Sequence, residues 1–307
     1  MALVDTDLTR DLVQARIQGR QSDTAGAVFK GLLVACLVVV LAALVALLIS
    51  VAPAGLEVFS VRGVSDFVLR PFSVRPEKAG VFQGIVGTVT CALLVAVVAF
   101  PMGVAAAVYL EEYAHDNWFT RIVNLVIRNL AGVPAIVYGL LGFALFVDGP
   151  FTGFTGGTTL LSTGLTLSIL VLPIVVITSA EAIRAVPSAL REGGYGVGAT
   201  RWEVTRTLVL PNAMGGMLTG TILGLARALG EAAPLFFMGA KTSIFSGGEW
   251  GDLRGDFTAL PMIISDWATR PATKWNGNTQ AAILVTLVLV LGINTVGIVL
   301  RNHFDKK

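Results

Sequence analysis

Two charged residues inside an otherwise apolar stretch are the side chains most able to do chemistry in this chain. Arg227 and Glu231 are the only ionisable residues between positions 207 and 240. Because they are four residues apart, they share one face of a helix and can form an ion pair. If a membrane helix begins near Asn212, Arg227 lies about 22 Å along it, within the hydrocarbon layer. An arginine there costs at least about 2.5 kcal/mol, so the pair must face protein or a water-filled path.

Two interpretations of this charge pair (Arg227 and Glu231) stay open. In the first, Arg227 attracts an anion in transit and Glu231 positions or gates it, so that both residues line a translocation path. In the second, the two residues are a structural ion pair that holds this helix to a neighbour. Gly216, Gly220 and Gly224 precede the pair at every fourth position. This glycine stripe is spaced to let another helix pack closely, and close packing is the role we predict for it.

No catalytic or metal-binding set is visible in the sequence. Cys36 and Cys91 lie inside apolar runs and should pack as small hydrophobic side chains, while His115 and His303 have no nearby Cys or second His. Residues 239–242 are the nearest match to the phosphate-binding loop of ATPases, but the positions where that loop requires glycine hold other residues. We therefore expect no catalytic residue, no metal, no cofactor and no ATP hydrolysis by this chain. The formal net charge of +2 comes without a basic cluster, which argues against nucleic acid as a partner.

The composition places the elements that carry the charge pair in a lipid bilayer. Charged residues make up 14% of the 307 residues, and the mean hydropathy is +0.77. A soluble domain carries roughly 25% charged residues, so much of this surface must face lipid. A bilayer core needs about 20 apolar residues per helix. Six segments meet that need and predict an all-α integral membrane protein with six transmembrane helices: residues 31–52, 82–109, 129–147, 161–180, 212–238 and 277–300.

The loops between these spans predict the orientation of the chain. Residues 1–30 and 301–307 are predicted as cytoplasmic tails of a permease domain over residues 31–300, because Lys and Arg are more numerous in the segments that this topology places inside. The expected location is the plasma membrane, the inner membrane of a bacterium. Residues 121–128 carry their polar side chains on one helical face, which predicts either a helix lying along the membrane surface or the start of a longer third span.

Three tryptophans mark the predicted outer loop, residues 241–274. Trp250, Trp267 and Trp275 lie in or beside this loop. Tryptophan is enriched at membrane interfaces, so we predict that they anchor the loop there. A docking surface for an external binding protein is the alternative.

The predicted inner loop between spans four and five, the coupling loop (residues 181–211), has the signals of a compact two-helix knob. Pro187 is suited to open a helix, and Gly198 can take the left-handed conformation that ends one. Thr200 and Glu203 form a capping-box pattern that starts a second helix. Pro211 is expected to break the chain again before span five. Small residues on one side of the first helix would let a partner surface approach closely.

This loop resembles the E-A-A-x3-G-x9-I-x-L-P motif of the permease subunits of bacterial ABC importers. The matching residues are Glu192, Gly193, Gly194, Gly198, Leu208, Leu210 and Pro211. The chain departs from the motif in having Gly for both Ala residues and Leu for Ile. The resemblance implies a type I ABC importer permease fold and a cytoplasmic coupling helix between spans four and five. It also implies that these residues dock into a separate ATPase subunit, which binds the ATP.

The segment around the charge pair resembles a narrower group, the permeases of phosphate importers. Residues 224–235 are similar to their R-A-x-G-E-[TA]-A-P-L stretch, whereas their sister permease subunit reads G-E-T-M there. Residues 100–103, 108–113 and 129–139 also fit, and the likeness runs from about Gly84 to the C-terminus. The resemblance implies that the chain forms half of a path for inorganic phosphate. It further implies a second permease subunit, an ATPase dimer and an extracytoplasmic phosphate-binding protein as partners.

The residues by themselves indicate only that the cargo is an anion. Another oxyanion, such as sulfate or molybdate, is therefore the alternative cargo within the importer hypothesis. A self-contained secondary transporter is the alternative from another class of protein. It predicts internal repeats and ion-coupling residues in broken helices, and the sequence has neither two similar halves nor a second intramembrane charge pair.

Overall fold

The computed structural model describes residues 24–240 and 249–305, and within these residues the chain is helical and contains no strand. Most of the predicted N-terminal tail, part of the predicted outer loop and the last two residues lie outside the described residues. The helices, with η marking 3₁₀ or π segments, are α2 (Thr24–Arg62), α3 (Val64–Leu69), η1 (Pro76–Lys78), α4 (Phe82–Val108), η2 (Tyr109–Tyr113), α5 (Trp118–Ala131), α6 (Ala135–Gly142), η3 (Phe143–Val147), α7 (Thr152–Thr155), α8 (Leu160–Arg184), α9 (Ser188–Gly196), α10 (Arg201–Val204), η4 (Thr205–Val209), α11 (Leu210–Gly230), α12 (Ala233–Phe237), α13 (Leu260–Ala268) and α14 (Ala272–Asp305).

The chain divides into two compact units, residues 1–50 and residues 51–307. The described part of the first unit is the beginning of α2, an apolar helix in which Lys30 is the one charged residue between positions 24 and 50. The second unit holds every other described element.

Within the described residues, five helices are long and apolar enough to cross a membrane. They contain α2, α4 with η2, α8, the run from α10 to α11, and α14. A sixth is reached if α5 and the α6–η3 segment, which meet at an angle of 104°, count as one span. The predicted spans 31–52, 82–109, 161–180 and 277–300 all fall inside such helices.

The third predicted span differs from a straight helix. Residues 121–128 belong to α5, a helix of its own, and α6 begins only after a break of three residues that ends in Pro134. Proline disfavours helical conformation in the residue before it, which explains the break. Residues 121–128 therefore do not continue into the third span as one straight helix, and the two helices count as a single span only as a bent pair.

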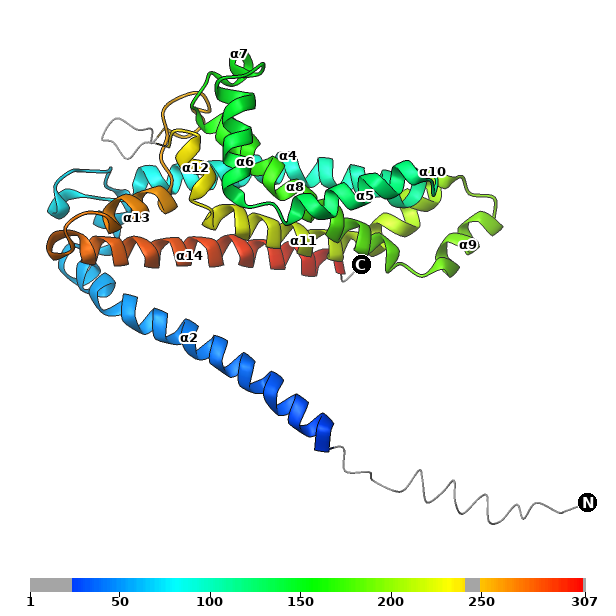
Figure 1. Ribbon diagram of the computed structural model, residues 1–307, viewed down its shortest axis with the longest axis horizontal. Coiled ribbons are helices and arrows are strands. Elements are labelled where there is room, and N and C mark those ends of the chain that lie inside the picture. The colour runs from blue at the N-terminus through cyan, green and yellow to red at the C-terminus, as the bar shows by residue number, and fades with distance from the viewer. Residues whose placement is uncertain (1–23, 241–248, 306–307) are drawn as a thin grey trace, which may run out of the picture. The chain divides into compact units, whose positions relative to one another are not determined.

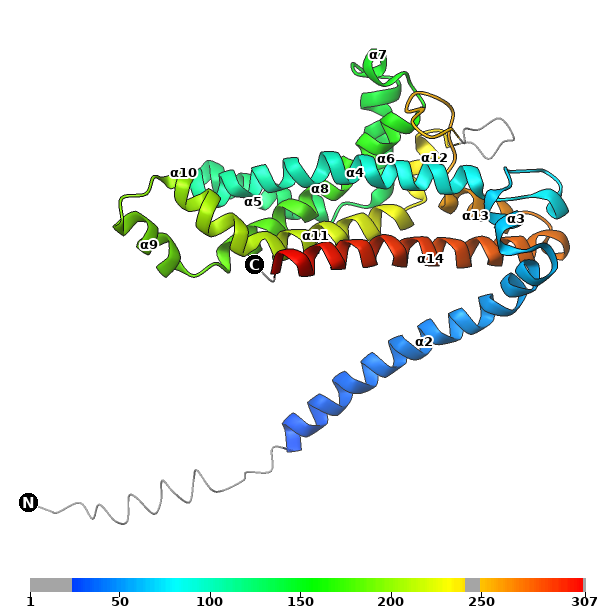
Figure 2. The ribbon, with the colours of Figure 1, turned by 180° about the vertical axis from the view of Figure 1, so that it is seen from behind.

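In the second unit, α8 lies at the centre of the bundle and packs against α4, α5, α6 and α11, and α11 in turn packs against α14. Figures 1 and 2 show α4, α11 and α14 lying lengthwise along one another, with α6 standing across them. The α9–α10 segment lies at one end of these helices, here named the α9 end, together with the C-terminal end of α14. The α3 and α13 helices lie at the other end, the α13 end.

The glycine stripe brings α11 against α8. A Cβ built on Gly216 would lie 2.6 Å from Ala182 Cβ, and one on Gly224 would lie 2.6 Å from Val171 Cγ1. A Cβ on Gly220 would overlap the Thr178 hydroxyl. The absence of a side chain at these three glycines therefore allows α11 and α8 to pack closely. The helix that packs against the glycine stripe belongs to the same chain.

The α13 end has its own apolar cluster. Trp267 is 1% exposed and Trp275 5% exposed, and they pack together with Phe67, Phe72 and residues of α13. The prediction that Trp267 and Trp275 anchor the loop at a membrane interface is therefore wrong, because both rings are buried against other side chains of the same chain. Trp250, in contrast, is exposed.

Candidate coupling loop and membrane charge pair

The first helix of the coupling loop, α9, is bounded by backbone geometry that the sequence predicts. Pro187 is its N-cap residue. At the other end, Gly198 has a φ of +86°. Its N–H donates to the Tyr195 carbonyl at 3.0 Å, and the Ala199 N–H donates to the Gly194 carbonyl at 3.1 Å. These two bonds form a Schellman motif, so the predicted left-handed stop at Gly198 is confirmed.

The second helix begins at the predicted capping box. The Thr200 hydroxyl accepts a hydrogen bond from the Glu203 N–H at 3.3 Å, and the Glu203 carboxylate accepts one from the Thr200 N–H at 2.7 Å. Both bonds satisfy N–H groups that a helix start leaves free.

Pro211 does not break the chain, contrary to the prediction. The helix runs on from Arg201 to Gly230, and Pro211 lies in the first turn of α11. The π-helix η4 directly precedes α11. At its end the Leu210 N–H donates to the Thr205 carbonyl. This wider turn lets the helix continue past a residue that has no N–H to donate.

The predicted coupling residues divide into an outward and an inward set. Glu192, Gly193, Gly198 and Pro211 are exposed. A Cβ on Gly193 would meet nothing within 4 Å. Gly194, Leu208 and Leu210 turn inward instead.

Sequence reasoning missed the exposed apolar side chains beside this outward set. Val197 is 85% exposed and Trp202 is 56% exposed, and Tyr195 is exposed as well. A motif marks residue types and spacing but does not tell which side chains the fold leaves uncovered. Exposed apolar side chains of this size at the tip of a loop are typical of a docking surface.

The charge pair lies where helix α11 ends. Arg227 is in the last turn, and Glu231 follows the helix in an extended conformation, with φ −84° and ψ 111°. The helix predicted to continue over residues 212–238 therefore stops at Gly230, and the two residues do not share an unbroken helical face. Pro234 explains the stop, because its ring would clash with the Gly230 carbonyl in a continued helix.

The two charges nevertheless meet. Arg227 Nε lies 3.3 Å from a Glu231 carboxylate oxygen. Their side chains are 40% and 27% exposed, so within this chain the pair is on the surface of a membrane-length helix. Charges within a bilayer are too costly to face lipid, so we expect protein or water to cover this surface.

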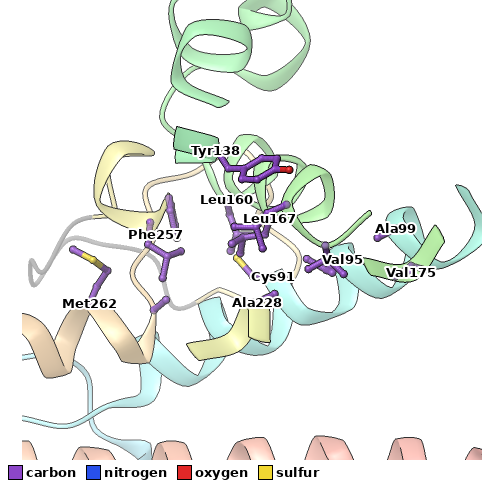
Figure 3. Close-up of a cluster of buried hydrophobic side chains, with 14 residues drawn as sticks. Cys91, Val95, Ala99, Tyr138, Leu160, Leu167, Val175, Ala228, Phe257 and Met262 are labelled. Atoms are coloured by element: carbon purple, nitrogen blue, oxygen red, sulfur yellow. The ribbon is translucent and has the colours of Figure 1, made fainter. Parts of the chain in front are cut away.

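The interior beneath the pair is apolar and packed. Ala228, which lies between the two charged residues, and Leu235, which follows them, belong to a buried cluster with Cys91, Val95 and Leu167. Figure 3 shows how side chains from α4, α6, α8, α11 and α13 converge there. An ion path through this cluster would cross apolar side chains.

The described residues contain no group of three or more His, Cys, Asp or Glu that could hold a metal ion. A chain with several membrane-length helices, a helical knob between two of them and an exposed charge pair at the end of one of them has the architecture of a membrane permease. The chain belongs to the family described as binding-protein-dependent transport system inner membrane component, whose model matches residues 99–307.

Relatives and solved structures agree with this family. The chain is 34% identical over 285 residues to the probable ABC transporter permease protein YqgH of Bacillus subtilis, covering 91% of this chain and 90% of that one. It is 35% identical over 231 residues to the phosphate transport system permease protein PstA of Mycobacterium leprae, covering 74% and 73%. PstA proteins of Xylella fastidiosa and Yersinia pestis are 32% and 30% identical. The resemblance to importer permeases predicted from the sequence is thereby confirmed.

Two solved structures show the same fold at low sequence identity. The MetNI methionine ABC transporter, in an inward-facing conformation, matches with a TM-score of 0.55 and 18% identity, over 72% of this chain and 94% of that one. A bacterial ABC transporter that imports alginate matches with a TM-score of 0.55 and 14% identity, over 95% and 98%. The predicted all-α fold of the type I importer permeases is therefore confirmed.

Proposed function

We propose that this chain is the permease subunit of an ATP-driven phosphate importer and forms half of its translocation path. The exposed charge pair carries the proposal. Its Arg227 can attract phosphate, and an exposed charge on a membrane-length helix is expected to face water or protein and not lipid. Because the chain's own interior is packed beneath the pair, a second chain must supply the other wall of the path.

The cargo is proposed from the relatives. Several proteins that are 30% to 35% identical to this chain are phosphate transport system permease proteins. The R-A-L-G-E-A-A-P-L sequence that holds the charge pair also resembles a stretch of phosphate-importer permeases. Sulfate or molybdate is the second candidate, since an arginine attracts any oxyanion.

The partners follow from the same proposal. The second wall of the path belongs to a related permease subunit of the PstC type, and an ATPase dimer engages the outward residues of the coupling loop. An extracytoplasmic phosphate-binding protein delivers the cargo to the opposite side. The chain itself binds no cofactor, and ATP is bound by the partner. This arrangement places the α9 end, with both termini, in the cytoplasm of a bacterium whose inner membrane the chain crosses several times.

Transport by the purified complex tests the proposal. The chain is isolated with the subunits that accompany it and reconstituted in vesicles that contain ATP. We expect labelled phosphate to accumulate only with ATP and binding protein, and unlabelled sulfate not to compete at equal concentration. Competition by sulfate would favour the second candidate cargo. Accumulation by the chain alone, without ATPase subunits, would overturn the importer proposal in favour of a secondary transporter.

A further inference from the structure

The short π-helix η2 at the end of α4 contacts three helices in and beside the coupling loop. Its residues Glu111, Glu112 and Tyr113 follow one another, and each holds an arginine from a different helix. Their partners are Arg184 at the end of α8, Arg191 in α9 and Arg201 at the start of α10. Consecutive helical residues point in different directions around the helix axis, which is why one turn can reach three neighbours.

The contact with α9 is the most enclosed of the three. Glu112 is 5% exposed and accepts hydrogen bonds from Arg191 Nη2 at 2.8 Å and Nε at 3.1 Å. The same guanidinium donates to the Val186 carbonyl at 2.8 Å and the Ile183 carbonyl at 2.9 Å. Arg191 thus joins the coupling helix, the end of α8 and the end of α4 through one planar group.

The other two contacts do not join α9 to α4 directly, because neither arginine lies in α9, and both are more exposed to solvent than Arg191. Arg184 is 47% exposed and reaches Glu111 at 2.7 Å, but it extends from α8 and not from α9. Arg201 lies over the Tyr113 ring at 5.4 Å from its centre and is itself exposed. Among the described residues, Arg191 makes the only ion pair between α9 and a membrane-length helix.

We propose that Glu112 and Arg191 are positioning residues that carry the movement of α9 to α4. The inference rests on the proposed function, in which an ATPase subunit grasps the coupling loop. When α9 moves, α4 must move with it or a nearly buried charge must lose its partner, and the second course is strongly unfavourable. α4 therefore moves together with the coupling helix.

The test compares phosphate movement with ATP hydrolysis in the reconstituted complex. Glu112→Gln, Arg191→Gln and the double variant remove the ion pair. The double variant leaves no unpaired buried charge, so it should assemble even where a single variant does not. We expect phosphate moved per ATP to fall by about fivefold or more in each, and the double variant to be no worse than either single one, as for residues that act as a unit.

A matched control is the ion pair between Asp116 and Arg121, which has a similar two-bond geometry but is exposed. Hydrogen bonding from Arg121 lowers the pKa of Asp116 below its ordinary value. This control pair makes no ion pair with the coupling loop in the described part of the chain. Arg121→Gln should therefore leave phosphate moved per ATP unchanged. A ratio at the wild-type value in the Glu112 and Arg191 variants would overturn the inference, even if less complex assembled, because a purely structural role changes amount and not ratio.

Amide hydrogen exchange gives a second measurement that does not depend on the cargo. In the wild-type complex, ATP should change exchange both in α9 and in residues 104–113. In the double variant, the change in α9 should persist while that in residues 104–113 is lost. An equal response of residues 104–113 in both proteins would overturn the inference. Failure of the wild-type complex to move phosphate would count against the proposed cargo alone, because this measurement needs only ATP.

Discussion

The residue with the most direct consequence for transport is Arg227. Two unit charges 4 Å apart attract by roughly 4 kcal/mol near a protein surface, and each 1.4 kcal/mol is tenfold in binding. Arg227→Ala should therefore lower phosphate uptake by about tenfold or more per assembled complex, while Arg227→Lys, which keeps the charge, should retain most of it. Uptake of labelled phosphate, normalised to the amount of complex, measures both.

The structural alternative for the charge pair gives a different result. If Arg227 only holds Glu231, the double variant Arg227→Ala/Glu231→Gln should restore full uptake by removing both charges together. We expect it to remain as impaired as Arg227→Ala. Restored uptake in the double variant would remove Arg227 from the path.

Among single residues, Glu112 illustrates what a sequence does not reveal. The stretch that holds it could be matched to importer permeases, and two adjacent glutamates at the end of an apolar helix are visible in the sequence. The partner, Arg191, is 79 residues further along the chain. Only the fold brings the two together, so spacing could not have assigned the pair.

At the scale of elements, the close packing of α11 on α8 depends on the glycine stripe. Gly220→Ala would force a methyl group into the Thr178 side chain, and such overpacking costs about 1–3 kcal/mol. We expect a lower unfolding temperature in detergent. Gly193→Ala is the matched control, because it is also a helical glycine but has open space around it. It should not lower the unfolding temperature, since alanine favours a helix by about 0.5–1 kcal/mol over glycine. Equal loss in both would argue against packing.

The open space at Gly193 also predicts where α9 meets its partner. Gly193→Trp should leave the fold of this chain unchanged, because nothing in it lies within 4 Å of the new side chain's first atom. It should abolish recovery of the ATPase when the chain is purified from membranes. Full recovery of the ATPase would place the docking surface elsewhere on the coupling loop.

Element boundaries show where local sequence signals suffice. The start of α10 at Thr200 and the stop of α9 at Gly198 are set by neighbours within a few residues, and the sequence predicts both. The end of α11 at Gly230 also has a local cause, Pro234, but the apolar composition on both sides hides it. The burial of Trp267 could not be predicted, because its cluster includes Phe67 and Phe72 from a distant part of the chain.

For the whole molecule, the proposed orientation makes a labelling prediction. In a chain whose Cys36 and Cys91 are replaced by serine, Ser188→Cys should react with a membrane-impermeant maleimide in inverted vesicles and not in intact cells. Glu249→Cys, which is exposed in the segment linking α12 and α13, should react in intact cells. The reverse pattern would place the coupling loop outside and remove any contact with a cytoplasmic ATPase.

Helix α4 is also fixed at its far end. Gly84 and Gly87 admit the chain between Thr258 and Ile263 so closely that a Cβ on Gly87 would overlap the Thr258 carbonyl. Thr88 accepts a hydrogen bond from the Leu260 N–H at 2.9 Å. Between the two fixed ends lies Pro101, which removes one backbone hydrogen bond from the middle of the helix. A force applied at Glu112 must therefore either bend α4 at Pro101 or displace the segment from Thr258 to Ile263 at the α13 end.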